Sequence, residues 1–398
     1  MVSAAVRAVV LGGGKRPFRI SDLFASGTYA GFDFTDLDVT KTWGAGALKL
    51  LYKDQANTPV ASSGDVVQLA LDKSQGIVIG SEQTTNGDFS GGTTSWTQQA
   101  ATFGVSGGVA TLTGDNARAD NTAFATIPGA LYRVSVTFIS ADHAAFVNAR
   151  RSDTTASIGS VGTIFGLVGV FYFVAATAST FMSIGNGGGF GGAWTSVIDA
   201  VSCKSVSGNH AWQTTSGSRP TWQANSGNPY INFDGVDDGL LTPLLPVAAS
   251  MTIAACFRAG GPGQNIIGAV DASVNRSYLG IGNAGGASNC FGAGWGSQNQ
   301  NTIFGGTSIV GTDVVGLFRA NASTVELWLN GTRVYGPKPP AGTPNTTIPL
   351  SLGCRNYNGT LDSFLTGKIY RAVAVQRFIT DSMIVPLMQT LGRGVVSF

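Results

Sequence analysis

Abundant glycine and scarce charge constrain this chain more than any other feature of its sequence. Glycine fills 56 of the 398 positions, while Asp, Glu, Lys and Arg together make up only 12%. Long amphipathic helices need more charged residues and leucine, whereas Gly, Ser, Thr, Val and Phe suit short strands joined by tight turns. Hydrophobic residues, at 43%, can fill substantial cores and exclude global disorder. The sequence therefore predicts an all-β protein, and its length predicts two or three domains.

Charge and cysteine usage exclude two classes of site. The formal net charge of +2 gives no electrostatic footprint for nucleic acid. The chain holds four cysteines in no CxxC pair and only two histidines, so a Cys/His zinc site is not expected. Buried thiols in a protein assembled in a reducing cytoplasm are the favoured interpretation, with one disulfide left open.

One uncharged stretch, residues 161–184, is long enough to span a bilayer. Gly, Ser and Thr interrupt it, no aromatic and basic belt flanks it, and its β-branched and aromatic residues favour strands. We therefore expect two sandwich strands, roughly 163–174 and 180–184, and no membrane insertion. The first 20 residues lack the n-region and cleavable h-region of a signal peptide, so they are expected to be a structural segment.

The most informative pattern is cut in two. Residues 71–74 (LDKS) stand far from 208–211 (GNHA), 219–221 (RPT) and 233–238 (FDGVDD). Together these segments resemble the entry into concanavalin A-like, laminin-G-type sandwich domains, which are common in bacteriophage virion proteins. A folded insert whose ends lie close together costs its host little closure entropy. The resemblance therefore implies one sandwich made of residues 27–76 and 207–398, interrupted by residues 77–206.

The interrupting segment has a pattern of its own. It opens with residues 86–89 (NGDF) and Trp96, continues with the alternating run 130–138, and closes with 197–202 (VIDAVS). This order resembles the jelly roll of carbohydrate-binding modules of families 4 and 9, although Ala200 stands where Asn is usual. The resemblance implies that residues 77–206 form a second β-sandwich, similar to a carbohydrate-binding module.

After Gly239 the chain returns to short apolar runs separated by turn residues. Asn330-Gly331 between two such runs predicts a hairpin turn, and Thr380-Asp381 predicts the start of a helix over 382–391. The segments 326–331 and 364–369 again resemble laminin-G-type sandwiches, which extends that resemblance to roughly residues 30–395. The expected strands are 251–258, 278–281, 314–318, 324–329, 333–335, 348–352 and 367–375.

The acidic residues do not form the pattern of a glycosidase. Such enzymes need two carboxylates about 5–9 Å apart, and glucanases of the concanavalin-like fold place theirs on one strand face with an ExDxE spacing. No ExDxE occurs, and Asp234, Asp237 and Asp238 stand in a turn context. His143 and His210 are expected to be a loop residue and a structural residue. The sequence therefore predicts a protein that is not an enzyme.

Oxygen-bearing side chains near both ends of the insert suggest a metal. The resemblance to carbohydrate-binding modules implies a structural calcium, because ligands from both chain ends would tie the domain shut. The alternative is that these side chains only stabilise turns, and Asp237 with Asp238 is a further candidate for a cation. The residues that match positions near the family's calcium are Glu82, Asn86, Asp88 and Asp199.

Aromatic residues in or near loops are the candidates for glycan contact. Sugars pack their apolar faces on aromatic rings and exchange hydrogen bonds with Asn, Asp and Arg. Each candidate could instead be a packing residue, as we expect for Trp212, Trp222 and Trp328. The candidates are Trp96, Phe190 and Trp194 in the insert, and Trp295, Asn299, Arg355 and Tyr357 in the outer domain.

The favoured function is that of a phage virion protein, a tail fibre, spike or head fibre, that adheres to host-surface polysaccharide without catalysis. It would be assembled in the bacterial cytoplasm and exposed on the particle, where copy number and oligomerisation, with a trimer as the family-level expectation, multiply weak contacts. Residues 1–26, with an apolar run and basic Lys15, Arg16 and Arg19, would attach it to other virion proteins. The alternatives are a purely structural virion component and a glycan depolymerase.

Overall fold

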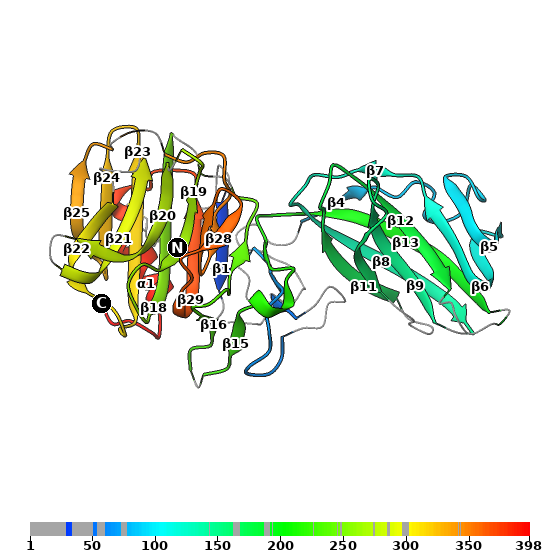
Figure 1. Cartoon of the computed structure of the whole chain (residues 1–398), viewed down its shortest axis with the longest axis horizontal. Helices are drawn as coiled ribbons and strands as arrows, with labels where there is room; N and C mark the ends of the chain where they lie inside the picture. The colour runs from blue at the N-terminus through cyan, green and yellow to red at the C-terminus, as the bar shows by residue number, and fades with distance from the viewer. Residues whose placement is uncertain are drawn as a thin grey trace, which may run out of the picture.

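In the computed structural model, the described residues form strands in three sheets, with one α-helix, α1 (Asp381–Gly392), and one short 3-10 turn, η3 (Ser216–Ser218). Figure 1 shows two lobes, one that holds β4 to β13 and one that holds the strands labelled from β15 onward together with β1. The all-β prediction is confirmed. The described residues are 29–33, 51–53, 60–72, 78–142, 144–161, 168–186, 192, 194–225, 227–244, 246, 249–273, 275–284, 287–296, 302–340, 342 and 344–398.

Eight strands form the sheet that carries α1, here called the helix-covered sheet. Apolar residues of α1, among them Ile384, Leu387 and Leu391, pack on its outer face. In spatial order its strands are β15 (Thr221–Gln223), β16 (Tyr230–Asp234), β29 (Thr366–Val375), β18 (Ser250–Ala259), β23 (Val314–Asn321), β24 (Val325–Leu329) and β25 (Thr332–Lys338), with β1 (Tyr29–Asp33) also paired to β29.

Eleven strands form the opposite sheet, here called the glycine-rich sheet. Inward-facing side chains of the two sheets interlock: the rings of Phe257 and Phe291 lie 6.2 Å apart, and those of Trp295 and Phe318 lie 5.7 Å apart. The outer domain is therefore a β-sandwich. The path of this sheet is β2 (Leu51–Tyr52), β3 (Leu69–Ala70), β14 (Ala211–Trp212), β17 (Leu240–Leu241), β26 (Ser351–Leu352), β19 (Asn265–Val270), β20 (Arg276–Ala284), β21 (Ala287–Gly296) and β22 (Thr302–Ser308), joined by β27 (Arg355–Tyr357) and β28 (Thr360–Asp362).

Ten strands, all between residues 78 and 207, form the insert sheet. One strand, β6, changes partner along its length, from β13 at residues 110–113 to β12 at 118–120. It bends at Gly114 and Asn116, whose φ angles are 112° and 57°, so the sheet folds over its own core as a jelly roll. Its strands are β10 (Ser157–Val161), β9 (Ala145–Arg151), β12 (Ser179–Asn186), β6 (Val109–Asn121), β13 (Thr195–Ser207), β8 (Leu131–Ala141), β11 (Val168–Val174), β4 (Val78–Glu82), β5 (Trp96–Ser106) and β7 (Phe124–Ala125).

The two parts of the interrupted sequence pattern meet in space. Strand β3 pairs with β14, and the Asp72 N–H donates to Nδ1 of His210 at 3.0 Å. The Asp72 carboxylate in turn accepts the Asn209 N–H at 2.9 Å. Val78 pairs with Ser207, so the chain leaves the outer sandwich and returns to it at neighbouring points. The predicted fold class, one sandwich inserted into another, is confirmed.

The apolar stretch at residues 161–184 contributes β11 and most of β12 to the insert sheet, as expected. In the described part of the chain, no helix has both the length and the apolar character needed to cross a membrane. All four cysteines are among the described residues, and each is a buried thiol outside any disulfide.

Candidate functional site

A row of polar side chains crosses four adjacent strands of the insert sheet. Thr97 on β5 lies opposite Asp120 on β6, Asp120 lies opposite Ser183 on β12, and Ser183 lies opposite Asn148 on β9. Side chains of directly opposed residues share one face of a sheet and stand about 5 Å apart. The apolar neighbours of Ser183, Met182 and Ile184, face the core. The polar row therefore faces outward.

A second row beside it supplies an aromatic ring. Arg118 on β6 lies opposite Gly185 on β12, which lies opposite Phe146 on β9. A Cβ on Gly185 would stand 2.4 Å from Cζ of Phe146, so the missing side chain lets the ring lie over the strand. Phe146 is half-buried, which leaves part of its surface open to a ligand. A third pair, Phe181 and Arg150, continues the same face.

Several polar atoms on this face have no partner in the described part of the protein. Oγ of Ser183, which is fully buried, and Oδ1 of Asp120 accept and donate nothing there, and the Nε atoms of Arg118 and Arg150 are likewise unpaired. Arg118 and Asp120 do form an ion pair at 3.1 Å through their other atoms. Buried polar groups normally find partners, so an unsatisfied set is informative about function.

A hollow of about 270 Å³ opens at one end of these rows. We call the two rows and this hollow together the sheet-face groove. The hollow itself is lined by Thr97, Gln99, Asp120, Asn121, Ala123, Ser152 and Phe181, and the rows beside it add Arg118, Phe146, Asn148, Arg150 and Ser183. A polyhydroxylated ligand can reach the unpaired hydroxyl, carboxylate and guanidinium atoms only when the side chains that bury them move aside, whereas the Phe146 ring can cover an apolar ligand face directly.

The aromatic residues predicted for sugar contact in the insert lie elsewhere. Trp96 is not open to a sugar, contrary to the prediction. It is only 5% exposed, its ring lies 5.2 Å from that of Phe89, and it donates its Nε1–H to the Asn86 carbonyl. Trp194 is half-buried just before β13, and its ring lies against Gly192. Phe190 lies outside the described residues.

The predicted residues of the outer domain are also dispersed. Trp295 is not open to a sugar either, contrary to the prediction, because it is 1% exposed and belongs to the core between the two outer sheets. Arg355 and Tyr357 lie together on the β27–β28 hairpin, where the guanidinium stands 5.4 Å from the tyrosine ring and pairs with Asp362 through two hydrogen bonds. Asn299 lies outside the described residues.

Two of the residues predicted as calcium ligands, Glu82 and Asn86, form hydrogen bonds in and around the loop between β4 and β5. Glu82 Oε1 accepts the N–H groups of Thr84 and Cys203 at 3.0 and 2.8 Å. The Asn86 amide bonds the backbone of the same loop, whereas Asp88 and Asp199 are exposed. Among the described residues, Glu82, Asp88 and Asp199 do not bring their carboxylates together. Calcium at these residues therefore stays a prediction.

The acidic side chains that do come together within the described part of the chain are Asp234, Asp237 and Asp238, whose oxygens lie within 4.8 Å of one another. Asp234 Oδ1 accepts the Val236 N–H at 2.8 Å, and Asp238 Oδ2 accepts the Asp234 N–H at 2.9 Å. Burial raises the pKa of Asp238 to about 6, and the two neighbouring carboxylates contribute to the rise. The hydrogen bonds are those of a turn, as the sequence indicated.

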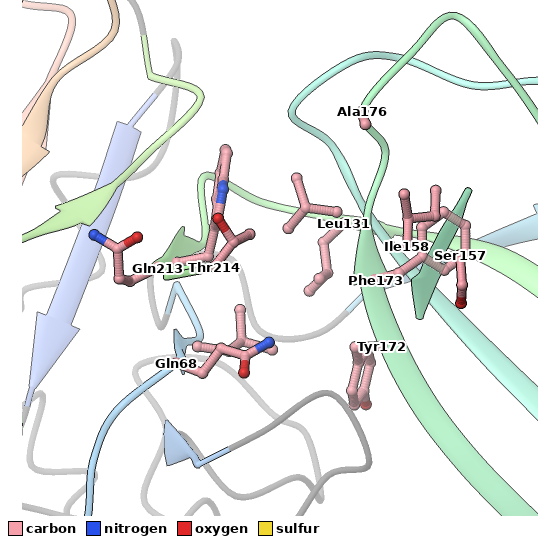
Figure 2. Close-up of a pocket in the computed structure, with 12 residues that line it drawn as sticks. Gln68, Leu131, Ser157, Ile158, Tyr172, Phe173, Ala176, Gln213 and Thr214 are labelled. Carbon is pink, nitrogen blue, oxygen red and sulfur yellow. The ribbon is translucent and has the colours of Figure 1, made fainter. Parts of the chain in front are cut away.

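A further cavity, of about 250 Å³, lies between the two sandwiches. Figure 2 shows Gln68, Gln213 and Thr214 of the outer domain on one side of it, and insert residues such as Leu131 and Tyr172 on the other. Its lining is mainly apolar, and Leu131 and Tyr172 belong to the same hydrophobic cluster as the outer core. The cavity is therefore part of the packing seam between the sandwiches.

Sequence reasoning missed the sheet-face groove, although one signal was present. In β9 the residues Ala145, Val147 and Ala149 face the core, so Phe146 takes an outward position in the alternation. A large aromatic residue on the outward side of a strand is a candidate contact residue. The cross-strand neighbours Asp120 and Ser183 come from distant segments, and their register could not be obtained from local patterns.

Comparisons with known proteins give limited likeness. No protein-family profile and no curated protein sequence match the chain. A solved family 4 carbohydrate-binding module is 16% identical over 31% of this chain and 99% of the module, with a TM-score of 0.26. A family 40 module of a Ruminococcus gnavus sialidase, bound to α2,3-sialyllactose, is 15% identical over 36% of this chain and 84% of that one, with a TM-score of 0.28.

A mutant NanB sialidase from Streptococcus pneumoniae is 17% identical over 35% of this chain, with a TM-score of 0.28. The match spans only 24% of that sialidase. At TM-scores below 0.5, these likenesses assign neither a ligand nor an activity to this chain.

Proposed function

We propose that this protein binds glycans without catalysis and that the sheet-face groove of the insert is a binding site. The observation that carries the proposal is the outward row in which the buried Ser183 Oγ and Asp120 Oδ1 lack protein partners beside the half-exposed Phe146 ring. An unmade buried hydrogen bond costs about 1–3 kcal/mol, so these atoms are expected to take a partner, and a ligand hydroxyl can supply it where a water molecule otherwise would.

The chemistry of the groove suits a sugar. The Ser183 hydroxyl and the Asp120 carboxylate can accept hydrogen bonds from sugar hydroxyls, and the guanidinium of Arg118 or Arg150 can donate to ring or hydroxyl oxygens. The Phe146 ring packs on the C–H face of the same unit. Asp120 is the single carboxylate of the groove as defined, whereas glycoside hydrolysis needs two. The proposal is therefore binding rather than cleavage.

Serine-to-alanine variants on opposite faces of the insert test the proposal. Full-length protein, S183A and S135A are compared on an array of bacterial surface polysaccharides, followed by calorimetry with a polysaccharide that binds. Ser135 lies half-buried on the outward side of β8, in the other layer of the jelly roll, and provides the matched control. We expect S183A to weaken binding about 5- to 10-fold, and F146A to weaken it at least as much. S135A should bind as the wild type does.

Absence of binding on the array at multivalent concentration would remove the glycan-binding proposal and favour a purely structural role. Equal binding by S183A, F146A and the wild type would place the sugar elsewhere. Release of soluble sugar from a bound polysaccharide would instead support a depolymerase.

The resemblance of the split sequence pattern to phage sandwich domains supports a finer proposal about location. In it, the chain is a fibre, spike or decoration protein on a phage particle, attached through residues 1–26, and oligomerisation multiplies weak sugar contacts. Residues 1–26 lie outside the described residues. Electron microscopy of particles labelled with an antibody to this chain would test it, and label on neither head nor tail would contradict it.

A further inference from the structure

A second groove lies on the outer face of the helix-covered sheet, beside the part that α1 covers. Its volume is about 370 Å³. Asn232, Asp234, Arg258, Thr366 and Lys368 line it together with the backbone of Gly260, Gly311 and Gly367. We call it the Lys368 groove. It belongs to the outer domain, whereas the sheet-face groove belongs to the insert.

The sheet register sets three polar side chains side by side in this groove. Asn232 on β16 lies opposite Lys368 on β29, and Lys368 lies opposite Arg258 on β18. Directly opposed residues stand about 5 Å apart on one face of a sheet. Two like charges in such a position destabilise the fold. The pairing of Lys368 with Arg258 is therefore unfavourable unless other groups compensate the two charges.

The two cations differ in their counter-charges. The guanidinium of Arg258 is held by Asp313, with Nε 2.9 Å from Oδ1. Within the described part of the chain, no carboxylate lies within ion-pair distance of Lys368. Its ammonium stands 4.3 Å from the centroid of the Tyr230 ring and 5.8 Å from that of the Tyr370 ring, and these contacts orient the charge without neutralising it. One end of the groove therefore offers an oriented, uncompensated positive charge.

The other end of the groove has the opposite character. Asp234 is exposed there, and the Val236 N–H holds its Oδ1 at 2.8 Å. The Asn232 amide lies between the two ends. An inorganic anion would gain from Lys368 but would be repelled by Asp234. A sugar that carries a carboxylate matches both ends, because its hydroxyls can donate to Asp234 while its carboxylate meets the cations.

We propose that the Lys368 groove binds an acidic monosaccharide unit of a polysaccharide. The carboxylate of the sugar pairs with Lys368 and with the open edge of Arg258, and its hydroxyls bond Asn232 and Asp234. This inference goes beyond the proposed function, because it assigns a second site, in the other domain, and a charged class of sugar. Failure of the proposal for the sheet-face groove would leave this inference unaffected.

Calorimetry with the full-length protein tests the inference. The probe is a hexuronic acid oligosaccharide, and the comparison ligands are the matching neutral hexose oligosaccharide and inorganic sulfate. Lys338 supplies the matched control, since its ammonium also stands over a tyrosine ring, 5.2 Å from that of Tyr335, on an exposed strand outside the groove. We expect K368Q to weaken hexuronate binding about 10-fold or more, and K338Q to change it less than about 2-fold.

A second variant, N232D, keeps the inference testable if K368Q fails to fold. N232D keeps the size of the side chain and adds a negative charge beside Lys368, so it should weaken the hexuronate and leave the near-UV circular dichroism unchanged. Hexuronate binding by the wild type should also weaken as sodium chloride is raised. S183A, which removes a group of the sheet-face groove, should leave hexuronate binding intact.

Four results would overturn the inference. They are no hexuronate binding by the wild type, equal affinity for the neutral oligosaccharide, sulfate binding as tight as hexuronate, or equal losses in K368Q and K338Q. Loss of hexuronate binding in S183A would assign the acidic sugar to the insert instead.

Discussion

Asp238 is a residue whose ionisation bears directly on stability. Only 6% of its surface is exposed, and burial raises its pKa to about 6. The same carboxyl titrates near 3.9 in an unfolded chain. Between about pH 4 and pH 6 the folded protein therefore holds a proton that the unfolded chain has lost. Asp238 consequently lowers the free energy of unfolding as the pH rises through this range, and its effect is level above it.

We expect D238N to remove this slope and to be about 1–2 kcal/mol more stable than the wild type at pH 7, a value reduced for solvent screening at the turn. The new amide oxygen can still accept the Asp234 N–H. Urea unfolding at pH 4, 5, 6 and 7 measures the effect. A variant whose stability follows the wild-type curve at every pH would contradict the assignment.

His210 acts in the opposite direction and has to be separated from Asp238. Burial lowers the pKa of His210, although the nearby Asp72 opposes the shift. The unfolded chain then binds the extra proton first, so this residue lowers stability as the pH falls below about 6.5. Because D238N leaves His210 in place, the difference between variant and wild type isolates the carboxyl.

At the scale of elements, a buried guanidinium joins α1 to the sheet beneath it. The side chain of Arg319 on β23 is 2% exposed, and its Nε lies 2.8 Å from Glu326 Oε2 on β24. The same guanidinium donates to the Ile379 carbonyl at 2.6 Å and pairs with Asp381 at the start of the helix. Arg319 therefore fixes where α1 begins and ties that end of the helix to β23 and β24.

Replacing Arg319 by Met should lower the free energy of unfolding of the outer domain by about 3–5 kcal/mol, because Glu326 is left buried without its main counter-charge. The double variant R319M/E326Q should regain part of this loss. Urea unfolding monitored by near-UV circular dichroism measures both. As a control, R151M breaks an exposed pair with Asp153 and should leave the free energy of unfolding close to that of the wild type. Equal stability of R319M and R151M would contradict the role given to Arg319.

Local patterns predicted the elements of the outer domain well where turn chemistry was strong. Asn330 and Gly331 have φ angles of 46° and 83° and join β24 to β25, as the Asn-Gly pair predicted. The helix expected over 382–391 is α1, Asp381–Gly392. The expected strand 348–352 shrinks to β26, Ser351–Leu352. Here Asn345 bonds the N–H and carbonyl of Ile348, which holds the preceding chain in a turn.

The candidate sites were predicted less well, because the composition of a loop says little about how deeply its side chains are buried. Trp295 follows a glycine-rich run, yet alternation along β21 turns its side chain into the core with Phe291. The sheet-face groove depends on register between segments that lie far apart in sequence, such as Asp120 opposite Ser183. The same holds for Asn232, Lys368 and Arg258. Pairing over such distances is decided by tertiary packing.

At the scale of the whole molecule, the insert pairs its strands separately from the outer domain but shares a hydrophobic cluster with it. Within the described residues, its strands pair only with one another, and β4 and β13 lie side by side where the chain enters and leaves. However, Leu131, Tyr172 and Val206 of the insert belong to the same hydrophobic cluster as Leu69 and other outer-core residues. The insert should therefore fold alone, while its removal should expose an apolar patch on the host.

Two shortened chains test this expectation and the boundaries at residues 77 and 207. One contains residues 77–207 alone, and the other replaces residues 78–206 by two glycines. We expect both to unfold cooperatively, because the short linker still lets β3 pair with β14 and Asp72 bond His210. The host chain should melt several degrees lower than the full-length protein, since Leu69 loses its cover from the insert.

Differential scanning calorimetry and near-UV circular dichroism measure both chains. The variant L69S in the shortened host serves as a control, because a polar side chain at the uncovered seam should cost less there than in the full-length protein, where Leu69 is 5% exposed. An insert without a cooperative transition would show that the two sandwiches fold as one unit. In that case the seam around Leu131 and Tyr172, rather than strand pairing within the insert, would hold the jelly roll together.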